Sequence, residues 1–380
     1  MKKMEEAIKC YIEDNYSAMM ELLKELCHIP APSHHEEKRA EYLKAYFEKM
    51  GAKGTYIDEA LNVIFPINCE GSNEITVFAA HTDTVFPDSE PMPYTDDGEK
   101  IHCPGCADDT ASVAVLTFMA KFFIEKDIKP EKGIMFVCNS CEEGLGNLKG
   151  TRKLFSDFSG RIKNFITFDS TPEVACNLSV GSHRYEVTVK TGGGHSFQDF
   201  GNLNAINELS GIVRKIYEIK VPEKEGAKTT YNVGDISGGT SVNTIAQSAR
   251  MLCEYRSDDK DCLAFMEERF KAIFEEAKSD KVEITVEKVG DRPCGNVERS
   301  KIAYLEGKII PLIEKIIGKE VRFVSGSTDC NIPHSLGVGA LCIGVDNHKG
   351  IHTREEWVEK ASLKTGLEIA IKSGLALMEG

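Results

Sequence analysis

Short segments that are almost wholly apolar alternate with helix-like segments over much of this chain. TVFAA at 76–80 and GIMFVCN at 133–139 carry apolar residues on both faces, which is typical of strands that helices cover on both sides. A helical segment at about 109–126 lies between them, and apolar strands and helices resume after residue 300. The alternation predicts an α/β domain built on a doubly covered, mainly parallel sheet.

The stretch from residue 181 to about 297 has a different pattern. Its first strand alternates, with Tyr185, Val187 and Val189 on one face and polar residues on the other, so we expect it to be half exposed. Helices at about 203–219 and 258–279 separate further strands. We therefore expect a small α+β domain inserted into the larger one, with boundaries at 1–180, 181–297 and 298–380.

The start of the chain is expected to be helical, because apolar residues between 12 and 26 form one stripe at helical spacing. The sequence then breaks at Pro30 and Pro32. A second helix is expected to follow, with Ser33 as its N-cap and Gly51 just beyond its end.

Net charge and hydropathy exclude several classes of partner. The 380 residues hold 60 acidic and 46 basic side chains, and a net charge of −14 disfavours nucleic acids and anionic membrane surfaces. The first residues lack the apolar core of a secretory signal. The longest apolar stretch, 111–123, is interrupted by Lys121 and is too short to span a bilayer. We expect a soluble cytoplasmic protein with no nucleic acid or membrane partner.

Candidate ligands follow the predicted strands. In open α/β sheets, ligands bind beyond the carboxyl ends of the strands. Period-two alternation directs His81 and Asp83, at the end of the strand at 75–80, to the same side of the chain. Further acidic and histidine side chains follow other strands or precede the apolar helix: Asp108, Asp109, Glu142, Glu143, Asp169, His348 and His352.

These residue types indicate a site for two divalent metal ions. Each residue alone could be a helix cap, a turn residue or a solvated loop residue, but their gathering at one sheet edge favours a common site. Histidines mixed with carboxylates suit zinc, manganese or cobalt rather than calcium. Two metal ions that lie close together need a carboxylate that bridges them. A neighbouring carboxylate that binds neither ion can then serve as a base.

The thirteen cysteines offer a rival site. Cys103 and Cys106 form one C-x-x-C pair, and Cys138 and Cys141 form another, although the gap between the pairs is long for a zinc site of four thiolates. Two alternatives therefore stay open. One is a binding protein that a structural zinc ion at the C-x-x-C pairs stabilises, and the other is a protein with the same α/β fold but no catalytic activity. Without a secretory signal the thiols are expected to be reduced, with Cys106 and Cys141 as small buried residues.

Taken in order, several motifs resemble those of a known family. They are HTDTV, GCADD, CEEGLGN, FDST, GGGHS, GGTSVNTI with EYRS, GSTDCNIP and GIHTREEW. Over essentially its whole length the chain is similar to the co-catalytic metallopeptidase family of carboxypeptidase G, peptidase T, aminoacylase and succinyl-diaminopimelate desuccinylase. The resemblance implies a three-layer α/β catalytic domain of the metal-dependent exopeptidase type, with a mixed, mainly parallel sheet. It also implies that residues 181–297 form a lid and a homodimer interface.

The resemblance implies a ligand set for two divalent ions. His81 and Asp169 would bind one ion, and Glu143 and His352 the other. Asp108 would bridge the two, and the peptide bond that follows it is expected to be cis. The ions are expected to be Zn²⁺, with Co²⁺ or Mn²⁺ as alternatives.

The resemblance also implies catalytic and substrate-binding roles. Glu142 would be the general base and acid, and Asp83 would orient the histidine that precedes it by two positions. From the inserted domain, His195 would donate a hydrogen bond to the oxyanion, in cis or from the partner subunit. Asn243 and Arg256 would contact the substrate.

The substrate is expected to be a small peptide. Asp169, where many family members have glutamate, makes the chain resemble the aminopeptidases and tripeptidases most. A di- or tripeptide aminopeptidase is therefore expected, and an N-acyl amino acid amidohydrolase (a deacylase) or a carboxypeptidase is the alternative.

Some positions depart from the family pattern or have no part in it. Residues 110–112 (TAS), Ala246 after NTI, and NHKG before the last ligand differ from the usual residues, but none is a proposed ligand. His183, His334 and His348 match no motif role and are expected to be packing or surface residues.

Overall fold

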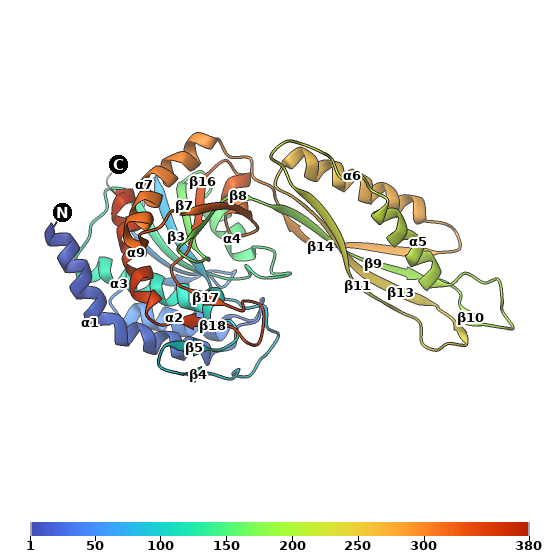
Figure 1. Cartoon of the computed structure of the whole chain (residues 1–380), viewed down its shortest axis with the longest axis horizontal. Coiled ribbons are helices and arrows are strands. Elements are labelled where there is room, and N and C mark those ends of the chain that lie inside the picture. Colours follow the sequence, from blue (N-terminus) through green and yellow to red (C-terminus); the bar gives the residue numbers. More distant parts are fainter. Residues whose placement is uncertain (1, 379–380) are drawn as a thin grey trace. The chain divides into compact units, whose positions relative to one another are not determined.

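The computed structural model describes residues 2–378 and divides the chain into two compact units. Unit 1 joins the residues up to Leu178 to those from Asn296 onward. Unit 2 is the segment between them, Ser179–Gly295, and it holds the elements from β9 to β14 in Figure 1.

An eight-stranded mixed sheet forms the centre of unit 1, in the order β1-β2-β6-β3-β7-β16-β8-β15. The four central strands β6, β3, β7 and β16 run parallel, and their neighbours β2 and β8 run antiparallel to them. This confirms the predicted fold class. The strands are β1 (Tyr56–Ile57), β2 (Val63–Ile67), β3 (Ile75–His81), β6 (Gly133–Asn139), β7 (Ile162–Phe168), β8 (Val174–Ser179), β15 (Arg322–Gly326) and β16 (Gly339–Ile343).

Helices cover both faces of this sheet, which gives three layers (Figure 1). Because side chains alternate along a strand, Phe78 and Phe136 pack into the core on one face and Val77 and Val137 into the core on the other. Within residues 2–378, no helix combines the length and the apolar character that a membrane crossing requires. The helices on the first face are α1 (Lys2–Cys27), α2 (Glu37–Lys49), α3 (Ser112–Glu125), α7 (Arg299–Ile317) and α9 (Ser362–Met378), and those on the second are α4 (Lys149–Asp157) and α8 (Asn331–Ser335).

A small second sheet of unit 1 was not predicted from the sequence. Its order is β17-β18-β5-β4, and its pairing sets Trp357 opposite His102. The sheet joins two segments that are far apart in the chain. Its strands are β4 (Thr95–Asp96), β5 (Lys100–His102), β17 (His348–Lys349) and β18 (Trp357–Glu359).

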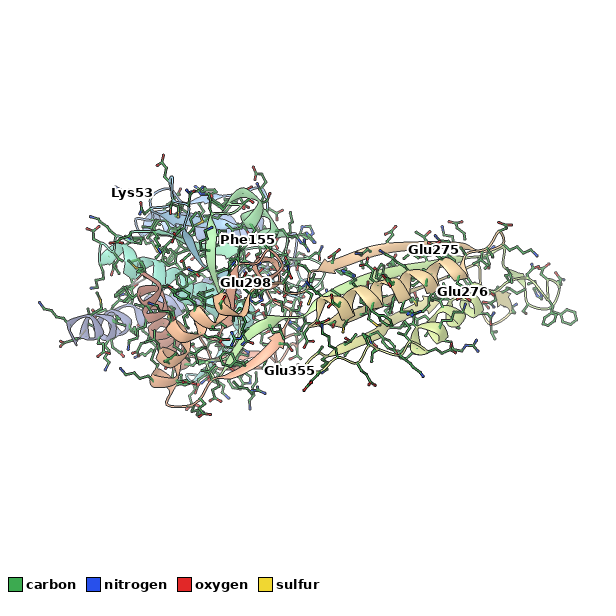
Figure 2. The ribbon with its side chains drawn as sticks, turned by 90° about the horizontal axis from the view of Figure 1, so that it is seen from above. Lys53, Phe155, Glu275, Glu276, Glu298 and Glu355 are labelled. Atoms are coloured by element: carbon green, nitrogen blue, oxygen red, sulfur yellow. The ribbon has the colours of Figure 1, made fainter. Side chains whose placement is uncertain are left out.

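Unit 2 is an antiparallel sheet in the order β11-β13-β9-β14, with α5 (Ala205–Tyr217) and α6 (Lys260–Ala277) packed on one face. Glu275 and Glu276 lie on the exposed side of α6 and mark that helix in Figure 2. A two-stranded ribbon, β10 (Gly194–His195) with β12 (Thr244–Ile245), extends the unit. The long strands are β9 (Gly181–Lys190), β11 (Thr229–Gly238), β13 (Ser248–Ser257) and β14 (Glu283–Arg292).

One predicted helix start is wrong, and a second lies a few residues later than expected. Helix α2 begins at Glu37, so Ser33 is not its N-cap, and the Ser33 hydroxyl donates instead to the Asp83 carboxylate at 2.6 Å. A charged acceptor binds a hydroxyl more strongly than a neutral one does, which favours this contact. Regular helix also begins only at Ser112, because the preceding π-helical segment Cys106–Ala111 holds Asp108 at φ −103° and ψ 93°.

Candidate metal centre

Neighbouring parallel strands of unit 1 end beside one another and present polar residues there. His81 is the last residue of β3, Asp169 follows β7, and Glu142 and Glu143 follow β6. The strands themselves are buried at almost every position, so ligand side chains can stand only where the strands end.

Two residues from outside the main sheet complete the cluster. Asp108 comes from the π-helical segment, and the bond that joins it to Asp109 is a cis peptide, as predicted. His352 lies between β17 and β18 and has a positive φ of 63°.

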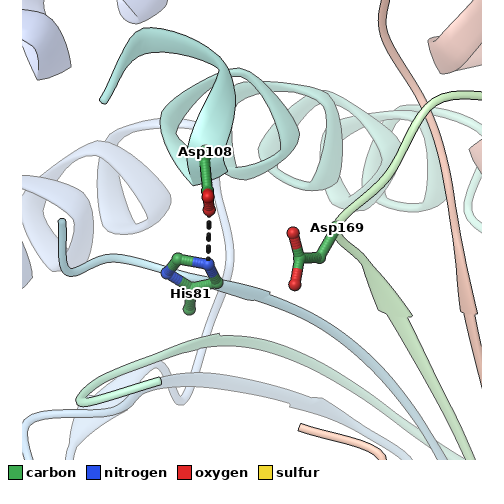
Figure 3. A group of neighbouring side chains, drawn as sticks. All are labelled: His81, Asp108 and Asp169. Atoms are coloured by element: carbon green, nitrogen blue, oxygen red, sulfur yellow. Dashed lines mark hydrogen bonds and ion pairs between the residues drawn. The ribbon is translucent and has the colours of Figure 1, made fainter. Parts of the chain in front are cut away.

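The Asp108 carboxylate lies between the two histidines. Its Oδ1 is 3.1 Å from Nε2 of His81, and its Oδ2 is 3.1 Å from Nε2 of His352. That imidazole of His352 is also 3.0 Å from Oε1 of Glu143. Figure 3 shows Asp108 and Asp169 reaching toward His81 from two different segments. Each oxygen of Asp108 thus faces a different group of ligands, as a bridging carboxylate requires.

The candidate ligand atoms form three overlapping groups. Within each group, one ligand atom of every residue lies within 4.8 Å of the others. The groups are His81 with Asp108 and Asp169, His81 with Glu142 and Glu143, and Asp108 with Glu143 and His352. The structure therefore brings together all five predicted metal ligands and the predicted base.

Asp83 holds the loop that presents two of the cluster's glutamates. Its buried carboxylate accepts the backbone N–H groups of Glu142, at 2.8 Å, and Glu143, at 2.9 Å, besides the Ser33 hydroxyl. Nδ1 of His81 is 3.1 Å from the backbone oxygen of Asp83 and 3.5 Å from its carboxylate. Asp83 thus holds the residues after β6 through its side chain and contacts His81 most closely through its main chain.

Burial and mutual charge shift the pKa values in this cluster. Burial and the charge of Asp108 raise the pKa of Asp169 well above its ordinary value. Burial acts to lower the pKa of His81, but the hydrogen bond to Asp108 and the neighbouring carboxylates outweigh it and raise that pKa well above the usual range. Hydrogen bonds that the His352 ring donates to the Asp108 and Glu143 carboxylates raise the pKa of His352 to about 10.

The donor set fits two divalent cations. Several carboxylates and two imidazoles converge in a small, largely buried space, and burial together with the charge of Asp108 raises the pKa of Asp169. Cations held between these groups would balance the charge of the carboxylates, and the mixture of nitrogen and oxygen ligands is the one that zinc and similar ions accept.

The three remaining predicted site residues belong to unit 2. His195 lies in the two-stranded ribbon and Asn243 directly precedes its second strand, and the Ser196 N–H donates to the Asn243 carbonyl at 3.0 Å. Arg256 lies on β13, and its guanidinium donates to Glu254 at 2.8 and 3.1 Å.

The His195 ring has a defined hydrogen-bonding state. Its Nδ1 accepts the backbone N–H groups of Phe197 and Gln198, both at 3.3 Å. An accepting Nδ1 has no proton, so the neutral ring carries its proton on Nε2, which is then a donor.

The cysteines do not form a competing site. All four C-x-x-C thiols are buried, as predicted for Cys106 and Cys141. Among the residues that the structure describes, no converging group of His, Cys, Asp and Glu ligand atoms contains a cysteine. The alternative of a zinc site of four thiolates therefore has no support in the structure.

Sequence reasoning missed one buried carboxylate beside the cluster. Glu356 lies four residues after His352, and its side chain accepts backbone N–H groups from the segment that presents Asp108. Burial raises its pKa to about 7. Its place in the motif GIHTREEW was the available signal, but two adjacent glutamates gave no way to tell the buried one from the exposed one.

Comparison with known proteins supports this description. The sequence model described as peptidase family M20/M25/M40 matches residues 77–373. The succinyl-diaminopimelate desuccinylase of Corynebacterium glutamicum is 24% identical over 346 residues, which cover 88% of this chain and 90% of that protein.

Solved structures share the fold at low sequence identity. A tripeptidase from Staphylococcus aureus matches with a TM-score of 0.70 and 22% identity, over 95% of this chain and 99% of that chain. The YXEP protein of Bacillus subtilis, described as a dinuclear metal-binding peptidase, matches with a TM-score of 0.65 and 12% identity, over 97% of this chain and 99% of that chain. At these identities the likeness concerns the fold.

Proposed function

The chain belongs to peptidase family M20/M25/M40 and is a metallopeptidase of that family, and we propose that it is a di- or tripeptide aminopeptidase. The main support for a two-metal hydrolase is the position of the Asp108 carboxylate. Its two oxygens face two separate groups of ligands. The likeness to a tripeptidase and the aspartate at position 169 support a peptide with a free amino terminus.

Two divalent ions would be held by the five converging ligands. His81 and Asp169 would bind one ion, Glu143 and His352 the other, and Asp108 both. When bound, such ions polarise the scissile carbonyl and lower the pKa of the attacking water. Zinc is the metal we propose, with cobalt or manganese as alternatives that the same ligands accept.

Glu142 is the proposed general base and acid. Glu143 contacts His352, and the Glu142 carboxylate converges with His81 and Glu143 at the edge of the ligand cluster. The Asp83 carboxylate accepts the backbone N–H groups of both glutamates. These hydrogen bonds fix the main chain of Glu142, from which its side chain would reach a water molecule. It would take the proton of the water and pass it to the leaving nitrogen.

Unit 2 would supply the remaining groups. The protonated Nε2 of His195 would donate to the oxyanion of the tetrahedral intermediate, and Asn243 and Arg256 would contact the substrate. We also propose that this unit, expected from the sequence at 181–297, acts as a lid and forms a homodimer. Phe197, 86% exposed, and Val242, 101% exposed, flank His195 and Asn243 and would be covered by such an interface.

A hydrolysis screen tests the substrate class. Free tripeptides and dipeptides, their N-acetylated forms, and N-acetyl amino acids are offered to the metal-stripped protein after zinc, cobalt or manganese is added back. We expect free tripeptides to be cleaved fastest and acetylation of the amino terminus to remove most of the activity. Faster hydrolysis of N-acetyl amino acids would favour the deacylase alternative, which the likeness to a desuccinylase supports.

A mixing experiment tests whether His195 acts in trans. Inactive His195→Ala and inactive Glu142→Gln proteins are combined under conditions that exchange subunits. If His195 serves the partner's site, one site of each heterodimer holds both intact residues, and activity returns. Exchange without activity contradicts the trans role, and a monomeric protein removes it.

A further inference from the structure

The buried carboxylate of Glu356 binds three backbone amides of one loop. Its side chain is 1% exposed, and its Oε2 accepts the Gly105 N–H at 2.7 Å. Its Oε1 accepts the N–H groups of Ala107, at 2.8 Å, and Asp108, at 3.0 Å. Both oxygens are therefore committed to the segment that presents the central carboxylate of the metal centre.

The loop is confined on its opposite side as well. Gly105 has a φ of +75°, and a Cβ atom at this position would stand 2.5 Å from Cγ2 of Thr84. The Thr110 hydroxyl also donates to the Gly105 carbonyl. The loop thus runs between Thr84, three residues beyond His81, and Glu356, and cannot move far toward either.

The segment from His352 to Glu356 contacts Asp108 at two points. The His352 ring lies 3.1 Å from the Asp108 side chain, and Glu356 accepts the Asp108 N–H. Within residues 3–378, no lysine, arginine or histidine forms an ion pair with Glu356, so the amides are its principal partners.

We propose that Glu356 is a positioning residue that fixes the Asp108 carboxylate between the two ligand groups by holding the backbone of residues 105–108. This inference rests on the proposed function only for the role of Asp108 as a metal ligand. Partners of metal ligands typically change metal affinity by about 10- to 100-fold when they are altered.

The test compares Glu356→Gln with Glu355→Gln in the full chain. Glu355 is the exposed neighbour labelled in Figure 2 and provides the matched control. A glutamine at 356 has only one acceptor oxygen, so its NH₂ group must face an amide N–H on one side. We expect amide hydrogen exchange in residues 105–108 of the metal-free protein to rise about tenfold in Glu356→Gln. Zinc affinity, measured by calorimetry, should fall about tenfold or more, and Glu355→Gln should change neither.

Three results would overturn the proposal: unchanged exchange, unchanged zinc affinity, or equal effects of the two substitutions. If Glu356→Gln does not fold, Glu356→Asp keeps the charge with a shorter reach, and it should show the same two changes to a smaller degree. Neither measurement uses a peptide substrate. Loss of zinc affinity in a protein that cleaves no peptide would therefore support the positioning role and reject the proposed function.

Discussion

The two large sheets of this protein are covered differently, and the difference explains where each can carry chemistry. In unit 1, strands β3 and β6 are buried at every residue, because helices lie on both faces. In unit 2, β9 alternates between buried and partly exposed residues, and β11 is largely exposed. Polar ligands in unit 1 must therefore gather at strand ends, whereas polar side chains in unit 2 line a whole face.

The sharpest test of this comparison contrasts two phenylalanines. Phe136 is fully buried and packs against Phe65, Phe78 and Phe123, whereas Phe197 of unit 2 is 86% exposed. Phe136→Ala should lower the free energy of unfolding by about 3–5 kcal/mol in urea denaturation, because it leaves a cavity. Phe197→Ala should change the unfolding free energy of the monomer by less than about 0.5 kcal/mol, because the proposed interface would cover Phe197 only in the dimer. Equal losses of unfolding free energy would mean that the buried and the exposed phenylalanine contribute equally to stability, which would contradict the comparison of the two sheets.

The next prediction concerns the end of β6. Glu142→Gln should lower kcat by about 100-fold or more, because the amide cannot accept the proton of the water. Thermal unfolding and metal content should stay near the wild-type values. Glu275→Gln, on the exposed side of α6, is the matched control and should leave kcat unchanged. If Glu142→Gln keeps more than about a tenth of the rate, another group is the base.

Adjacent residues of β9 test the half-covered sheet within a single strand. Val187 is buried against the core of unit 2, whereas Glu186 on the opposite face pairs with Arg250 at 3.4 Å near the surface. Val187→Ala should cost about 2 kcal/mol of unfolding free energy, from lost burial and the cavity left behind. Glu186→Ala should change it by less than about 0.5 kcal/mol. Similar costs at the two positions would show that both faces of this sheet are covered in solution.

The smallest expected effect is a pH dependence in unit 2. His183 is buried beside Tyr255, with its Nδ1 at 2.6 Å from the tyrosine hydroxyl, and Glu267 and Asp291 lie within 3.8 Å. Burial lowers the pKa of His183, and the positive charge of Lys288 lowers it further. The unfolded chain therefore binds a proton more readily, and this contribution to stability is lost as the pH falls below the unfolded value of about 6.5.

Denaturation of wild-type protein and His183→Gln between pH 8 and pH 5 measures this contribution. The substitution should reduce the slope of unfolding free energy with pH over this range. An unchanged slope would assign the pH dependence to other groups.

The sequence predicted the architecture of unit 1 well because the signals are local. Apolar residues on both faces of 76–80 and 133–139 indicated doubly covered strands, and the structure has strands there. His81, Glu143 and Asp169 could be picked out because each lies at the end of a strand or in the loop that follows one, where a sheet exposes its ligands. The helix start at Ser33 was wrong because a local capping pattern cannot reveal a carboxylate 50 positions away in the chain.

The sequence alone therefore determined the covered sheet, the types of ligand and their order along the chain, since these depend on periodicity and on residue chemistry. Only the tertiary structure decided which groups hold the ligands in place. The pairing of β5 with β18 brings Glu356 to the amides of residues 105–108, and the return of the chain after α1 brings Ser33 to Asp83. Backbone amides look the same at every position of a sequence, so an acceptor for them can be recognised only once the fold has brought the two segments together.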